Sequence, residues 1–177
     1  MLVVDSLNRK EGINIFDEYG RYFYSKGGMG PRSGGIFSYG ARFGVPKTLH
    51  VTWRTGSDVR MQANGMFGGG TIVGDYIVPV ASRIPEDLIQ DLRRDERGSF
   101  RLKIRLHDDG VLIGWDIERR PGFDPKNRNK HGNIVYVPAV HSFVGGDFRE
   151  AEIYNGKPVR KGWYIHPKTG QRIETDV

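Results

Sequence analysis

Hydrophobic and polar residues alternate over residues 99–120, which read S-F-R-L-K-I-R-L-H-D-D-G-V-L-I-G-W-D-I-E-R-R. A period of two is typical of half-buried β-strands, and Asp109-Gly110 near the centre favours a two-residue hairpin turn. The resulting register gives one apolar face and one face with cross-strand ion pairs. The predicted facing pairs are Leu106–Ile113, Ile104–Trp115 and Leu102–Ile117 on the apolar face, and Lys103–Asp116 and Arg101–Glu118 on the charged face. Packing and charge pairing therefore use this hairpin fully and leave no residue for catalysis.

Shorter β-prone runs, separated by turn residues, fill most of the remaining chain. Strands are expected over residues 12–17, 21–25, 36–43, 48–54, 71–80 and 133–140. Residues 26–35 read K-G-G-M-G-P-R-S-G-G and are predicted to form a loop, because glycine dominates them. Near the C-terminus, Asn155-Gly156 and Lys168-Thr169-Gly170 indicate two small hairpins.

One helix is predicted, over about residues 84–95. Pro85 suits an early helical position, and Arg93 and Arg94 complement the helix dipole at the other end. The apolar stripe of this helix consists of Ile84, Leu88, Ile89 and Leu92. We expect a mainly β fold, either a β-sandwich or a curved antiparallel sheet with this one short α-helix, in a single globular domain spanning residues 1–177.

Composition limits the classes of function that the chain can have. The chain has 177 residues, enough for one domain with a substantial core. Its 27 Lys and Arg residues against 21 Asp and Glu give a net charge of +6, which favours an acidic partner. Nucleic acid is not expected, because the basic residues are scattered and no nucleic-acid-binding module is recognisable. The absence of cysteine excludes disulfides, thiol catalysis and cysteine-type zinc sites.

The motifs that would carry catalysis or cofactor binding are absent or have the wrong spacing. Two residues separate Gly44 from Lys47, whereas a P-loop needs glycine directly before lysine. No G-x-S-x-G segment is present for a serine nucleophile. The histidines form no i, i+4 pair and are spread along the chain as His50, His107, His131, His141 and His166. We therefore expect no enzyme, cofactor or metal site, and a site assembled from distant residues stays open.

Aromatic residues are concentrated between Tyr19 and Phe43, where they would serve either the core or an aromatic-rich binding face. Several short patterns also follow one another in a recognisable order. They are Gly12, Asn14, Asp17, Tyr22–Tyr24, Gly27–Gly35, Val51-Thr52-Trp53, Asp75-Tyr76-Ile77-Val78-Pro79, the short helix and the hairpin that bears Trp115. This order resembles a family of small bacterial cell-envelope lipoproteins encoded beside type VI secretion effectors, several of which are immunity proteins against lipase toxins. Unlike these relatives, the chain has no cysteine to carry a lipid.

The resemblance implies an immunity protein that binds and neutralises a type VI antibacterial effector, expected to be a phospholipase. The protein would block the effector's active site or a motion that the effector needs. The alternative is another envelope or secretion-associated binding module, either an effector adaptor or a carbohydrate-binding domain. The implied location is the periplasm, where a lipid anchor on a longer precursor would attach the protein to the membrane. The candidate contacts with the toxin, chosen by exposure and residue type, are Arg32, Tyr39, Arg119, Arg120, Phe123 and Arg128.

Overall fold

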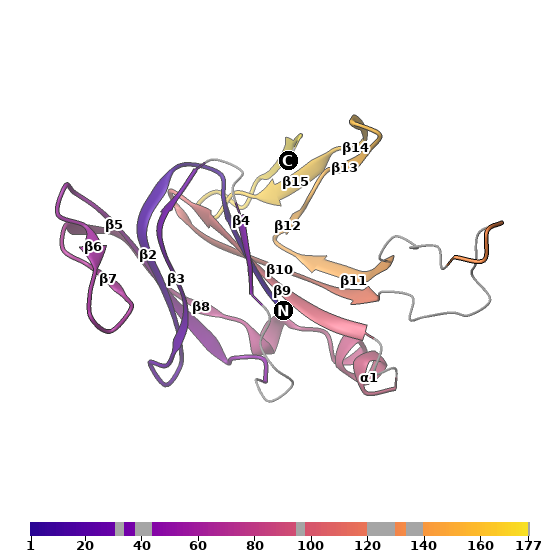
Figure 1. Cartoon of the computed structure of the whole chain (residues 1–177), viewed down its shortest axis with the longest axis horizontal. Helices are drawn as coiled ribbons and strands as arrows, with labels where there is room; N and C mark the ends of the chain where they lie inside the picture. The colour runs from indigo at the N-terminus through magenta and orange to yellow at the C-terminus, as the bar shows by residue number, and fades with distance from the viewer. Residues whose placement is uncertain (31–33, 38–43, 95–97, 120–129, 134–139, 177) are drawn as a thin grey trace.

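Two β-sheets make up most of the computed structural model, which describes residues 1–30, 34–37, 44–94, 98–119, 130–133 and 140–176 (Figure 1). The five-stranded sheet consists of β1 (Leu2–Ser6), β4 (Gly34–Phe37), β9 (Gly98–His107), β10 (Gly110–Arg119) and β11 (Val140–Gly146), in the order β11-β10-β9-β1-β4. The four-stranded sheet consists of β2 (Lys10–Asp17), β3 (Tyr22–Met29), β5 (Thr48–Thr55) and β8 (Thr71–Pro79), in the order β3-β2-β5-β8.

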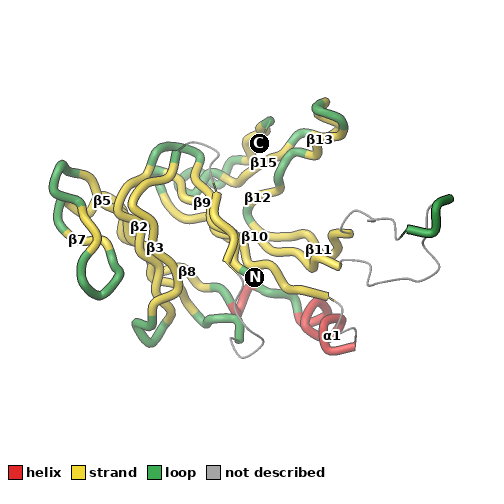
Figure 2. Tube along the Cα trace, viewed as in Figure 1, coloured by secondary structure: helices red, strands yellow, loops and turns green. Residues whose placement is uncertain are grey.

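One hydrophobic core is shared by the two sheets. Val4, Ile104 and Ile113 of the five-stranded sheet join Ile15 and Val51 of the four-stranded sheet in one cluster of fully buried side chains. Their inward direction follows from the period of two in each strand. The predicted mainly β fold with one short helix is confirmed, and strands dominate the secondary structure throughout (Figure 2).

The predicted helix forms as α1 (Glu86–Arg94), after a short 3₁₀ turn, η1 (Ala81–Arg83). Leu88 is fully buried, and the other members of the apolar stripe pack partly buried against the core. Acidic residues occupy the first turn and arginines the last, as the helix dipole favours. No helix in the described part of the chain is long and apolar enough to cross a membrane.

A third, smaller sheet and a hairpin form the C-terminal part. The sheet consists of β12 (Phe148–Arg149), β15 (Gly162–Ile165) and β16 (Arg172–Thr175), and the hairpin of β13 (Glu152–Tyr154) and β14 (Lys157–Arg160), which projects from the molecule (Figure 1). Both predicted small hairpins are therefore confirmed. Asn155 and Gly156 have φ values of 49° and 72°, which is the positive range that a type I′ turn requires.

The long hairpin of β9 and β10 forms as predicted, but the predicted register was wrong by two residues. Leu106 pairs with Val111 rather than with Ile113, and the turn lies one residue earlier, at Asp108 and Asp109. A shift of two residues keeps each side chain on its predicted face. The apolar face therefore still points into the core.

Two side-chain contacts are made at the observed turn, one from another sheet and one within the hairpin. Lys10 Nζ on β2 donates to Asp108 Oδ1 at 2.6 Å, and the Asp109 N–H donates to His107 Nδ1 at 3.0 Å. Neither aspartate has a positive φ, whereas a primed two-residue turn needs positive φ at both positions. The other facing pairs on the observed register are Ile104–Ile113, Leu102–Trp115, Arg101–Asp116, Lys103–Gly114 and Ser99–Glu118.

The predicted loop over residues 26–35 was wrong at both ends. Residues 26–29 continue β3 and pair with β2, and Gly34-Gly35 belong to β4. Glycine is used here for close packing rather than for a turn, since a Cβ on Gly27 would lie 3.0 Å from the ring of Phe67.

The five-stranded sheet is mixed rather than purely antiparallel. Strand β1 pairs in parallel with β9, and this pairing joins segments that are distant in the sequence. The predicted strands over 36–43 and 133–140 lie largely outside the described residues.

Candidate functional site

The outer face of the four-stranded sheet carries a row of large side chains in register. Tyr22 on β3 lies opposite Phe16 on β2. Phe16 in turn lies opposite His50 on β5, and His50 lies opposite Ile77 on β8. The period of two directs this row away from the core, because residues next to each member belong to the core cluster. We refer to Tyr22, Phe16, His50 and Ile77 as the sheet-face row.

The sheet-face row is accessible. The exposed fraction is 73% for Ile77 and 53% for Tyr22. The rings of Phe16 and His50 lie 6.1 Å apart between centroids, so the middle of the row is continuous. Four strands at the usual spacing give the row a span of about 14 Å. Large apolar side chains exposed side by side are typical of a protein-binding surface.

A short hairpin of β6 (Arg60–Met61) and β7 (Phe67–Gly68) covers the neighbouring part of the same face. Asn14 of β2 holds it with two hydrogen bonds, because the Asn14 amide donates to Phe67 O and accepts from Phe67 N, both at 2.9 Å. Ser25 Oγ adds a third bond, to Gly65 O at 2.9 Å. This hairpin braces β2 and β3 and leaves the sheet-face row open.

One hydrogen bond fixes the polar member of the row. His50 Nε2 lies 2.6 Å from Asp75 Oδ1, so the carboxylate on β8 orients the imidazole on β5. An oriented imidazole between Phe16 and Ile77 gives the row a polar group at a defined position, which favours specificity in a complex.

The aromatic residues of the first third divide between core and surface. Phe23 and Tyr24 are buried in the core, and burial raises the pKa of Tyr24 to about 12. Tyr19 and Tyr22 are exposed, and Arg21 stacks on Tyr19 at 4.9 Å from the ring centroid. Core packing is therefore the use observed for Phe23 and Tyr24, and Tyr19 and Tyr22 lie on the surface.

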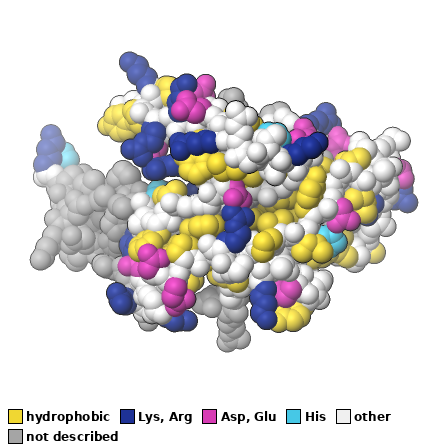
Figure 3. Space-filling view, turned by 180° about the vertical axis from the view of Figure 1, so that it is seen from behind, with side chains coloured by type: hydrophobic (Ala, Val, Ile, Leu, Met, Phe, Trp, Pro, Cys, Tyr) yellow, Lys and Arg dark blue, Asp and Glu magenta, His cyan; other side chains and the backbone are white. Residues whose placement is uncertain are grey.

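Hydrophobic side chains are also visible on the rear of the molecule (Figure 3).

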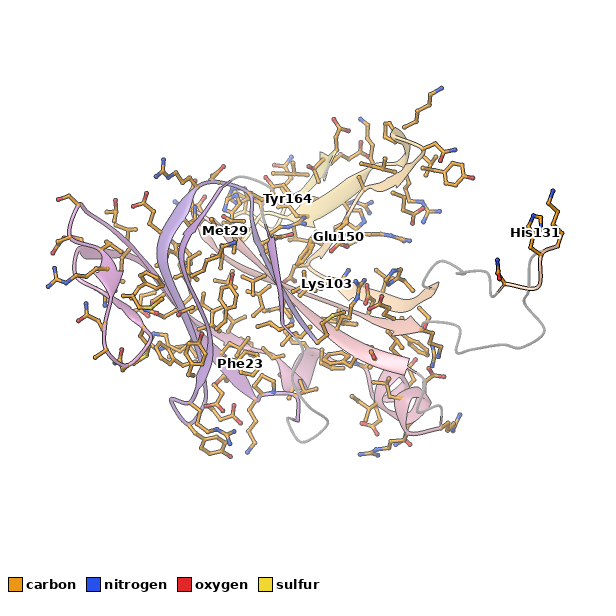
Figure 4. The ribbon with its side chains drawn as sticks, viewed as in Figure 1. Phe23, Met29, Lys103, His131, Glu150 and Tyr164 are labelled. Carbon is orange, nitrogen blue, oxygen red and sulfur yellow. The ribbon has the colours of Figure 1, made fainter. Side chains whose placement is uncertain are left out.

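Several charged side chains of the five-stranded sheet are, by contrast, buried. Asp116 is 1% exposed and contacts Arg101 and Lys103, with Lys103 Nζ 2.9 Å from Asp116 Oδ2. Lys103 Nζ also donates to Glu150 at 2.8 Å, beneath the C-terminal sheet (Figure 4). The charged face of the hairpin is thus covered, and its ion pairs are structural.

One of the six predicted toxin contacts lies in the described part of the chain. Arg32, Tyr39, Arg120, Phe123 and Arg128 all lie outside the described residues. Arg119, the sixth, donates through Nη1 to Ser142 Oγ at 2.7 Å and pairs through Nη2 with Asp91. These bonds tie β10 to β11 and α1, so Arg119 holds the sheet and the helix together.

Two histidines that are far apart in the sequence meet at the β9–β10 turn. The rings of His107 and His166 lie 4.8 Å apart between centroids, in an edge-to-face arrangement. His166 Nε2 lies 3.4 Å from Asp109 Oδ2. Among the described residues, these three are the group of histidine and carboxylate side chains close enough to hold a metal ion. No local sequence pattern marks this cluster, because His107 and Asp109 lie at the β9–β10 turn and His166 lies in the distant β15–β16 loop.

The hydrogen bonds of both rings do not suit a metal ion. His107 Nδ1 accepts from the Asp109 N–H, and His166 Nδ1 accepts from the Lys168 and Thr169 N–H groups. A neutral ring whose Nδ1 accepts carries its proton on Nε2, whereas a metal ligand at Nε2 needs that proton on Nδ1. The cluster is therefore best described as a contact between two sheets.

No family model matches the chain. The searches of curated proteins and of solved structures also returned no match.

Proposed function

We propose that this protein is an immunity protein that binds and neutralises a secreted antibacterial effector of a type VI system. The sheet-face row carries the proposal, because it presents aromatic and aliphatic side chains on a rigid sheet. A few such anchors supply most of the binding energy in protein complexes. The resemblance to envelope immunity lipoproteins suggests a phospholipase as the effector and the periplasm as the location, with a lipid anchor on a longer precursor.

Neutralisation by binding requires no catalytic group on this chain. The row would occupy the entrance of the effector's active site or block a motion that the effector needs. A net charge of +6 would accelerate association with an acidic effector surface. Rigid presentation also matters, because a preformed surface loses little conformational entropy when it binds.

The proposal is tested by producing the protein in the periplasm together with the effector encoded beside it. We expect the cells to survive and the two proteins to be recovered as a complex. Continued killing, with no complex at micromolar concentration, would overturn the proposal. Complex formation without protection would also overturn neutralisation and would favour an effector adaptor.

A second experiment locates the contact. Ile77→Asp and Tyr22→Ala should each weaken binding of the effector at least tenfold, about 1.4 kcal/mol, because charge or truncation enters a desolvated contact. Ile153→Asp on β13 is the matched control, since Ile153 is also exposed but lies outside the four-stranded sheet. Equal melting temperatures of the variants exclude unfolding as the cause. Wild-type affinity in both row variants would place the contact elsewhere.

A further inference from the structure

The contact between His107 and His166 joins the C-terminal sheet to the turn of the long hairpin. The loop between β15 and β16, residues 166–171, lies directly against that turn. Pro167 packs on Gly110, where an added Cβ would lie 2.7 Å from Pro167 Cβ. The ring of Tyr164 on β15, labelled in Figure 4, lies 5.7 Å from the His107 ring between centroids.

Both imidazoles use Nδ1 as a hydrogen-bond acceptor in this contact. His107 Nδ1 accepts the Asp109 N–H at 3.0 Å, and His166 Nδ1 accepts the Lys168 N–H at 3.2 Å. The Thr169 N–H shares the second acceptor at 3.4 Å. A protonated ring donates from both nitrogens, so an Nδ1–H would point at a backbone N–H and these hydrogen bonds would be lost.

We propose that His107 and His166 form a pH-sensitive latch, which holds the loop of residues 166–171 against the β9–β10 turn and opens when the two rings take up protons. This inference is independent of the proposed function. Protonation acts in two ways, because it removes the acceptors at Nδ1 and places two positive charges 4.8 Å apart between ring centroids. His107 is 9% exposed, so water screens this repulsion poorly.

The charged groups around the latch determine the direction of the switch. Burial is the main cause of the lowered pKa of His107, and the charge of His166 lowers that pKa further. Asp109 and Asp108 act in the opposite direction, and Lys10 on β2 adds to the lowering. The carboxylate of Asp109 also faces His166, with Oδ2 3.4 Å from His166 Nε2. The fold therefore favours neutral His107, and stability decreases as the pH falls below the usual histidine value of about 6.5.

The opening should remain local. Backbone pairing of β12 with β15 and the hydrogen bond from the Ile165 N–H to Asp147 O at 2.7 Å do not involve either histidine. The ion pair of Lys103 with Glu150 also stays in place. We therefore expect acid to release the loop and the start of β16, with β15 still attached to the molecule.

Hydrogen exchange measured by mass spectrometry tests the latch at pH 7.5 and pH 5.0, with labelling times scaled for the intrinsic effect of pH. In the wild-type protein, protection of residues 166–173 should fall at least tenfold at the lower pH. A peptide from β5, residues 48–55, is the internal control and should keep its protection. Equal protection of the loop at both pH values would overturn the proposal.

The decisive variant is His107→Asn combined with His166→Asn. The Asn Oδ1 occupies the place of the histidine Nδ1, so it accepts the same backbone N–H groups but does not titrate. Loop protection should then be similar at both pH values, within about twofold. His166→Ala lacks the acceptor, so the loop should be poorly protected at both. An undiminished acid effect in the double variant, or full protection in the alanine variant at pH 7.5, would overturn the latch.

Discussion

The buried carboxylate of Asp116 provides the sharpest stability test, through the substitution Asp116→Asn. Arg101 Nε donates to Asp116 Oδ1 at 2.5 Å, and Lys103 Nζ lies 2.9 Å from Oδ2. Burial alone would raise the pKa of Asp116, and the hydrogen bond from Arg101 with the charge of Lys103 outweighs it, so the pKa is lowered. Asparagine keeps the volume and removes the charge, which leaves the buried Lys103 and the partly buried Arg101 without their shared partner.

The expected loss of unfolding free energy depends on the contacts that Lys103 and Arg101 keep after the substitution. Removing one partner of a buried ion pair costs about 3–5 kcal/mol. Lys103 keeps its contact with Glu150 at 2.8 Å, and the Arg101 side chain is 18% exposed and contacts His141. The loss should therefore lie near the lower end, at about 3 kcal/mol of unfolding free energy. With a urea m-value of about 2 kcal/mol/M, the unfolding midpoint falls by about 1.5 M.

Urea unfolding followed by circular dichroism at pH 7.5 measures this loss. Glu174→Gln is the matched control, because it makes the same chemical change in a pair with Lys161 whose side chains are about two-thirds exposed. That change should cost less than about 1 kcal/mol. The lowered pKa of Asp116 means that its contribution is complete above about pH 4 and is lost as the pH falls through the folded value. A loss no larger than that of Glu174→Gln would refute the reasoning.

Two further substitutions test packing and the role of Arg119. Gly74→Ala should destabilise the protein by about 1–3 kcal/mol in urea unfolding, because the new Cβ would lie 2.0 Å from the Trp53 ring. Gly28→Ala is the control and should change stability little, because its Cβ would meet nothing nearer than 4.0 Å. Arg119→Gln should lower stability by about 1–2 kcal/mol in thermal unfolding, since it weakens the ties from β10 to α1 and β11. Lys157→Gln, an exposed residue on β14, is its control and should leave the melting temperature unchanged.

Periodicity predicted which way side chains point more reliably than it predicted which residues face one another. In the long hairpin, alternation placed Leu106 on the inner face, and that prediction was confirmed. Its partner was wrong, because the turn lies at Asp108 and Asp109 instead of at Asp109 and Gly110. Asp108 is also contacted by Lys10 from another sheet, and local turn preferences do not include such a contact.

In the candidate site, too, periodicity accounts for the direction of side chains but not for which residues lie next to one another. Leu49, Val51 and Trp53 alternate along β5 and are buried in the core, so the period of two directs His50 to the opposite face. The sheet-face row depends, however, on the order β3-β2-β5-β8, which no local pattern contains. The meeting of His107 with His166 likewise arises only when the C-terminal sheet folds over the hairpin turn.

Some charged side chains are buried and some large apolar side chains are exposed, which composition alone would not predict. This arrangement bears on where a partner binds. Lys103 and Arg105 are 5% and 2% exposed and are paired with acidic side chains, so these positive charges are not available to attract an effector. Ile77 and Tyr22, which by residue type belong in a core, are exposed on one face of a rigid sheet. A search for the partner contact among the described residues should therefore begin at the sheet-face row, with charge acting on the rate of association rather than on the contact itself.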